Sequence, residues 1–78
     1  MPERYTFASV FNYDATLGTI TLNFPIIING LRYNQGAVVT RYTPFIGGLN
    51  LFNYLGRDIK GTFNSLTREV TILGFYYA

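Results

Sequence analysis

Turn-forming residues divide this chain into short segments, and no stretch of ten or more residues carries apolar side chains at helical spacing. Between the turns, apolar and polar residues alternate, as along a β-strand with one buried face. The clearest case is segment 19–24, where Ile20, Leu22 and Phe24 alternate with polar residues. The pattern therefore predicts an all-β fold: a small antiparallel barrel or sandwich of about five to seven short strands.

The expected strands are bounded by recognisable turns. Asn29-Gly30 predicts a two-residue hairpin, and segments 12–18 and 64–67 predict two further turns. Pro25 cannot donate a hydrogen bond to a sheet, so the chain is expected to bend there or to lie at an edge. The strands are then expected at 3–11, 19–24, 26–28, 31–33, 37–42, 58–63 and 68–77.

Segment 45–56 differs from the rest of the chain. Gly47-Gly48 breaks any regular structure, and Leu51 and Leu55 are four residues apart, followed by Gly56. A glycine commonly follows the last turn of a helix. The sequence therefore allows at most one short helical turn near residues 49–55, or a long ordered loop.

The residue types that are missing exclude most catalytic chemistry. The 78 residues contain no His and no Cys, which removes the usual general base, a thiol nucleophile, disulfides and a Cys/His zinc site. The four acidic residues are dispersed, and Asp58 and Glu69 in particular follow arginines, as surface charges do. We therefore expect a single small β domain, residues 1–78, that is not an enzyme and has no catalytic residues, no cofactor and no metal site.

Three Arg-Tyr dipeptides, at 4–5, 32–33 and 41–42, raise the possibility of nucleic-acid binding. Cations hold phosphates and aromatic rings stack on bases in proteins that bind single strands. However, neighbours in a strand face opposite sides, and the net charge is only +2. The pattern favours rings in the core with cations outside. A small β-barrel binding module for single-stranded nucleic acid or carbohydrate is kept as the alternative function.

A chain this small gains little stability from its core, and this one has no disulfide to add to it. Only 13% of its residues are charged, no charge lies between Arg41 and Arg57, and strand 68–77 is apolar on both faces. Exposed apolar area marks interaction surfaces, and a hydrophobic edge strand invites another strand. We expect the contact in loop 43–56 and in a terminal edge strand, 70–77. The interface residues we expect are Phe45, Leu49, Leu51, Phe52, Tyr54, Leu55, Leu73, Phe75, Tyr76 and Tyr77.

These features favour a non-enzymatic structural or assembly protein that packs as a subunit of an oligomer or larger particle. Few charges and many Thr, Asn and aromatic residues lead to the hypothesis of a virion component: a decoration, tail or connector subunit. The expected partner is protein, through self-association or a larger assembly, and neither nucleic acid nor a membrane. The start of the chain lacks the apolar stretch of a signal peptide, and the longest apolar run, 24–28, is too short for a membrane helix. We therefore expect cytoplasmic synthesis, with incorporation into a virion as the further hypothesis.

Overall fold

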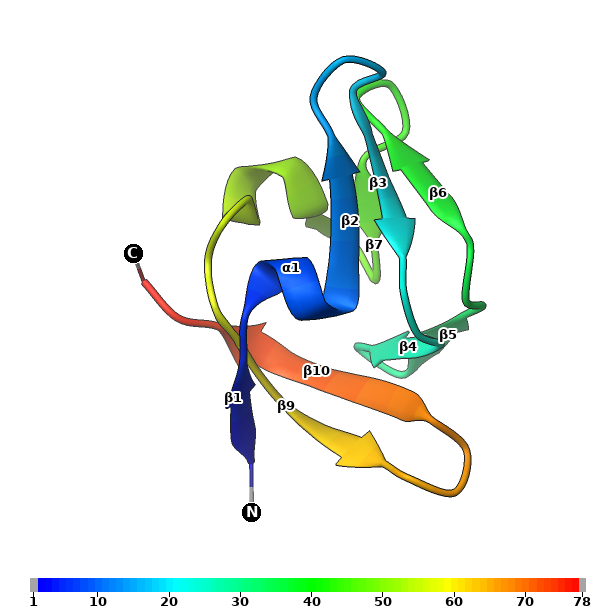
Figure 1. Cartoon of the computed structure of the whole chain (residues 1–78), viewed down its shortest axis with the longest axis vertical. Coiled ribbons are helices and arrows are strands. Elements are labelled where there is room, and N and C mark those ends of the chain that lie inside the picture. The colour runs from blue at the N-terminus through cyan, green and yellow to red at the C-terminus, as the bar shows by residue number, and fades with distance from the viewer. Residues whose placement is uncertain (1, 78) are drawn as a thin grey trace.

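The computed structural model describes residues 2–77, which form short strands in three sheets and two single helical turns (Figure 1). The strands of this part of the chain are β1 (Glu3–Tyr5), β2 (Phe11–Asp14), β3 (Thr19–Leu22), β4 (Ile26–Ile28), β5 (Leu31–Tyr33), β6 (Val38–Thr40), β7 (Phe45–Ile46), β8 (Leu49–Asn50), β9 (Ile59–Asn64) and β10 (Glu69–Phe75). The helical turns are α1 (Phe7–Val10) and the 3-10 turn η1 (Leu51–Tyr54). The all-β class is confirmed, and η1 is the helical turn expected near residues 49–55.

The strands are more numerous than expected for two reasons. Segment 45–50 forms the small β7–β8 hairpin, and the predicted strand 3–11 is wrong because α1 splits it into β1 and β2. Phe7 and Val10 explain the split. They would face opposite sides of a strand, whereas one helical turn brings side chains three apart onto the same side. Both are buried, and Phe7 packs on Phe11 with ring centroids 4.9 Å apart.

The largest sheet has the strand order β1-β9-β10-β4-β5, and the second has the order β2-β3-β6. The strand pairs are antiparallel as expected, with one exception: β4 runs parallel to β10, with Ile26 opposite Val70. The expected bend at Pro25 is present between β3 and β4, and the Pro25 carbonyl accepts a hydrogen bond from Val70 N at 2.9 Å. The bend lets consecutive strands serve two different sheets.

β10 lies in the middle of the large sheet, so the prediction that the terminal strand is an edge is wrong. It pairs with β9 along its length and with β4 through residues 70–72. A strand that is apolar on both faces is as typical of the interior of a sheet as of an exposed edge. The pairing with β9 shifts register between Ile72 and Gly74, which leaves Leu73 on a β-bulge.

Three hairpin turns were expected from their residue types, and all three are present. Asn29 and Gly30 both have positive φ, 51° and 78°, as a two-residue primed turn requires. The β2–β3 and β9–β10 turns have the same hydrogen-bonding pattern. In each, the side chain of Asp14 or Asn64 accepts hydrogen bonds from the backbone amides two and three residues later. Each turn ends on a positive φ, at Gly18 in the first and at Arg68 in the second.

The core lies between the two larger sheets. It is entirely hydrophobic, and every one of its members is less than a tenth exposed. The core residues are Phe7, Val10, Phe11, Ile20, Leu22, Ile26, Ile28, Val39, Ile46, Leu51, Ile59, Val70 and Ile72. Loop 43–56 contributes Ile46 and Leu51, which shows that part of this uncharged loop folds inward.

Candidate interaction surface

The structure places the ten predicted interface residues at very different depths. Leu51 is fully buried in the core, so its prediction as an interface residue is wrong: the 3-10 turn directs this side chain inward. Phe45, Leu73 and Tyr77 are 65%, 56% and 90% exposed. The other six are half-buried, namely Leu49, Phe52, Tyr54, Leu55, Phe75 and Tyr76.

One group of these residues surrounds the bulge of β10. A small hollow of about 50 Å³ is lined there by Leu49, Leu73 and Phe75, together with Ile28 and Asn29. Leu73 stands outward because side chains alternate along β10 and its neighbour Ile72 is buried, and at the bulge it also has no partner in β9. Two segments far apart in the sequence, β8 and the end of β10, therefore bring apolar side chains together around one hollow, beside the polar Asn29.

A second group lies on and after η1. Phe52 and Leu55 line a wider hollow of about 300 Å³ with Tyr13 and Arg41, and Phe52 meets Tyr13 edge to face at 6.3 Å. The two groups are joined through η1, because Tyr54 stacks on Phe75 with ring centroids 4.6 Å apart. We call the joined area the η1 surface: Leu49, Phe52, Tyr54, Leu55, Leu73 and Phe75.

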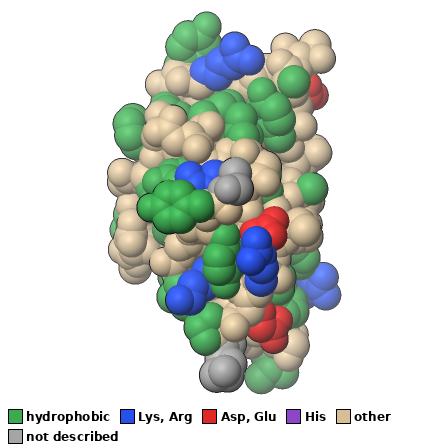
Figure 2. Space-filling model, turned by 90° about the vertical axis from the view of Figure 1, so that its left-hand side faces the viewer, with side chains coloured by type: hydrophobic (Ala, Val, Ile, Leu, Met, Phe, Trp, Pro, Cys, Tyr) green, Lys and Arg blue, Asp and Glu red, His purple; other side chains and the backbone are tan. Residues whose placement is uncertain are grey.

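A clamp of arginines and tyrosines holds the segment that follows β10. The Arg57 guanidinium lies 4.9 Å from the ring centroids of both Tyr54 and Tyr77, and its Nε donates a hydrogen bond to the Tyr76 carbonyl at 2.7 Å. Arg4 lies 4.3 Å over the Tyr76 ring. Figure 2 shows a face on which Lys and Arg side chains recur among hydrophobic ones. Arg4 and Arg57 contact aromatic rings of their own chain. These two arginines therefore mark the edge of the η1 surface.

The three Arg-Tyr dipeptides behave in two ways. Tyr5 and Tyr33 are half-buried, while the arginines before them form surface ion pairs: Arg4 with Asp58 at 2.7 Å and Arg32 with Glu69 at 2.6 Å. For these two dipeptides the expected arrangement is confirmed. For the third it is wrong, because Tyr42 is 94% exposed. Tyr42 lies beyond the end of β6, where strand alternation no longer applies.

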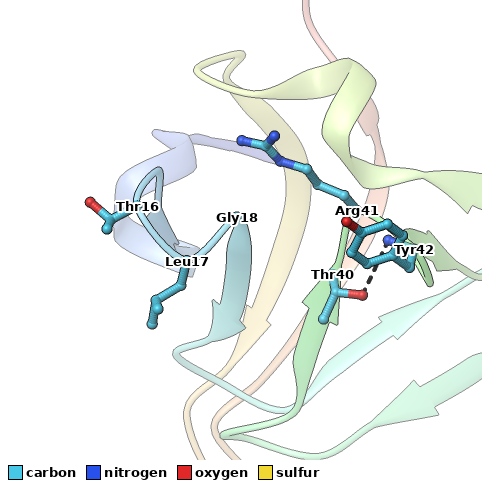
Figure 3. A pocket seen from close by; sticks show the side chains of 6 residues that line it. All are labelled: Thr16, Leu17, Gly18, Thr40, Arg41 and Tyr42. Carbon is cyan, nitrogen blue, oxygen red and sulfur yellow. Dashed lines mark hydrogen bonds between the residues drawn. The ribbon is translucent and has the colours of Figure 1, made fainter.

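Arg41 was not predicted as a site residue, yet it lines two hollows. The first, of about 240 Å³, lies between the β2–β3 turn and the end of β6 and is lined by Leu17, Gly18 and Tyr42 among others (Figure 3). The second is the hollow beside Phe52. Among the described residues, no carboxylate lies within 4 Å of the Arg41 guanidinium. The sequence signal is the Arg41-Tyr42 dipeptide itself, but a strand expected to run through 37–42 places the two side chains on opposite faces, whereas β6 ends at Thr40.

The hydrogen bond from Arg32 lowers the pKa of Glu69, and partial burial, with the nearby Glu3 carboxylate, raises the pKa of Tyr5. Across residues 2–77, no three acidic residues gather where they could hold a metal ion.

The helical turns of residues 2–77 are too short to cross a membrane. Comparison with protein families, with curated proteins and with solved structures found no match to this chain.

Proposed function

We propose that this chain is a non-enzymatic structural subunit that packs through the η1 surface into an oligomer or larger particle. The observation that carries the proposal is the continuity of that surface. It runs from the bulge at Leu73 through the stacked rings of Phe75 and Tyr54 to the hollow beside Phe52. No charged residue occurs in segment 42–56, which supplies most of it.

Covering this surface stabilises the assembled state. Each square ångström of apolar area removed from water contributes about 25 cal/mol, and aromatic side chains concentrate at the centres of protein interfaces. Single exposed apolar residues are ordinary on protein surfaces, whereas a contiguous apolar area marks a contact. Leu73, which lies at the bulge of β10 and is more than half exposed, has the position of such a contact residue.

The contact proposed is packing between side chains rather than the addition of a strand to β10, to β1 or to the end of β6. β10 already has neighbours on both sides through residues 70–72. The Thr40 carbonyl at the end of β6 accepts a hydrogen bond from Thr43 N, and the edge strand β1 carries Glu3 and Arg4. Charges and occupied carbonyls at an edge oppose pairing with another chain.

The narrower hypothesis of a virion component, such as a decoration, tail or connector subunit, stays a prediction. It rests on composition. The η1 surface supports any assembly in which these apolar side chains are covered by protein.

Light scattering on matched serine variants tests the proposal. We expect the parent chain to exceed the monomer mass in solution, and Leu73→Ser and Phe52→Ser to lower that mass. Leu66→Ser is the control, because Leu66 is 94% exposed but lies in the β9–β10 turn, outside the η1 surface. A parent that stays monomeric at high concentration, or folded variants that keep the parent's mass, would contradict the proposal.

The alternative, a binding module for single-stranded nucleic acid or carbohydrate, is supported by Arg41 and Tyr42. An exposed ring beside a cation without an ion pair offers stacking and phosphate contact. Fluorescence anisotropy with a labelled oligonucleotide tests it: binding that Arg41→Gln abolishes and Arg68→Gln leaves unchanged would favour this function. With so few cations we expect weak binding that salt removes.

A further inference from the structure

Asn29 is the only asparagine in the sequence that is followed by glycine. This pair is chemically special, because a backbone amide can attack the side-chain amide of the asparagine before it. A glycine on the attacking side leaves that approach open, since it has no side chain. The other asparagines precede larger residues.

The turn between β4 and β5 leaves the reacting groups accessible. Asn29 and Gly30 are both exposed, and nothing lies within 4 Å of the position that a Cβ on Gly30 would take. The Gly30 amide makes none of the hydrogen bonds found in the turns and loops of the described residues. The nucleophile is therefore free, and water reaches it.

We propose that Asn29 is a self-modification site, at which water converts the side-chain amide to a carboxylate and thereby releases the β7–β8 hairpin from the β4–β5 turn. Gly30 N forms a bond to Cγ of Asn29 and loses its proton, and Nδ2 departs as ammonia, leaving a five-membered imide. Water then opens the imide. Attack at Cγ gives aspartate, and attack at the main-chain carbonyl gives isoaspartate. No oxidant or reductant is needed.

The group that departs is the one that links the β4–β5 turn to the tip of the β7–β8 hairpin, whose Ile46 is also anchored in the core. Asn29 Nδ2 donates a hydrogen bond to the Gly47 carbonyl at 2.6 Å, and Gly47 N donates one to the Tyr33 hydroxyl at 2.7 Å. Gly47 also fits closely against Ile28: a Cβ on it would lie 2.8 Å from the Ile28 side chain. The β7–β8 hairpin is thus fastened to the turn at one glycine.

Aspartate and isoaspartate both break the hydrogen bond between residue 29 and the Gly47 carbonyl. A carboxylate has no proton to donate, so it faces the Gly47 carbonyl as a second acceptor and repels it. Isoaspartate also adds an atom to the main chain, which the two-residue turn between Ile28 and Leu31 cannot accommodate. In the unmodified chain, the hydrogen bond to Gly47 holds the amide in place, so opening of the hairpin and conversion promote each other.

The inference does not depend on the proposed function, although Asn29 and Leu49 line the same hollow. The first experiment incubates the folded chain in mildly alkaline buffer and measures each asparagine by peptide mass spectrometry, with isoaspartate detection. We expect conversion at Asn29 and none over the same time at Asn64, the control in the other hairpin. Tyr33→Phe removes the hydroxyl that accepts a hydrogen bond from Gly47 N, and we expect this variant to accelerate the conversion of Asn29. Equal rates at Asn29 and Asn64 in the folded chain would overturn the proposal.

The second experiment makes the same substitution at two positions, with an effect expected at Asn29 and none at Asn64. Asn29→Asp replaces a donor, whereas Asn64→Asp keeps the acceptor oxygen that receives hydrogen bonds from Leu66 N and Thr67 N. We expect Asn29→Asp to lower the melting temperature and to remove hydrogen-exchange protection at the Gly47 amide, and Asn64→Asp to do neither. Retained protection at Gly47 in Asn29→Asp would overturn the release of the hairpin.

Discussion

Gly61 occupies the most crowded glycine position in the chain, and replacing it with alanine tests the central strand pair. It is buried in β9 opposite Ile72 of β10. A Cβ at this position would lie 2.3 Å from the backbone oxygen of Thr71, whereas ordinary contact begins at 3.4 Å. The obstacle is main chain rather than a flexible side chain, so the two strands themselves must move.

The distance by which β9 and β10 must separate sets the expected loss in the free energy of unfolding. The strands would have to part by about 1 Å, which takes a hydrogen bond of ordinary length beyond the range in which it is effective. Overpacking costs about 1–3 kcal/mol, and a buried backbone group left without a partner adds a similar amount. We therefore expect Gly61→Ala to lower the free energy of unfolding by about 3 kcal/mol, a large part of the stability of a small domain.

Gly74 supplies the matched control, because it lies in β10 next to the same bulge and has nothing within 4 Å of its Cβ position. Gly74→Ala is expected to change the free energy of unfolding by about 0.5 kcal/mol at most. Urea denaturation followed by tyrosine fluorescence or circular dichroism measures both variants. Equal stabilities of Gly61→Ala and Gly74→Ala would refute the close approach of β9 and β10.

Three further predictions concern single residues. Arg68→Gly should raise the free energy of unfolding by about 0.5–1 kcal/mol in urea, because Arg68 has a φ of 63° that glycine adopts without strain; a loss of stability would contradict this. Glu69→Gln should lower the free energy of unfolding at pH values above 4.5, the ordinary pKa of the carboxyl group. This loss of stability relative to the parent should vanish as the pH falls through the lowered pKa of Glu69 in the folded state. Urea titrations at several pH values measure the loss, and a loss that does not change with pH would contradict the prediction. Ile20→Asp should unfold the chain, since Ile20 is fully buried, whereas Thr21→Asp should be tolerated; circular dichroism compares them, and equal damage would mean that β3 is buried on both faces.

The parts of the fold that sequence could predict are those decided by local chemistry. Asn29-Gly30 specifies its turn through two positive φ angles, and the alternation around Ile20 and Leu22 specifies which face of β3 is buried. The helical turn α1 escaped prediction because Phe7 and Phe11 also match a strand with one buried face. Only the burial of Val10 together with them distinguishes the two conformations.

What depends on distant segments could not be predicted. The parallel pairing of β4 with β10 joins strands from opposite halves of the chain, and no residue type specifies it. The sequence indicates where to look for a surface, because a long uncharged loop and an apolar strand must be covered by something, and the role of these residues as an interface stays a prediction. Which of its residues face inward depends on tertiary packing, which buries Leu51 and leaves Leu73 outside.

The measurement that tests the account most directly is side-chain footprinting of the parent chain by hydroxyl radicals across a concentration series, with sedimentation run in parallel. If the chain is a subunit that packs through the η1 surface, its mass rises with concentration. Phe52, Tyr54 and Leu73 then become protected while Leu66 does not. A constant monomer mass, or a rise in mass with no protection at these three residues, would contradict it.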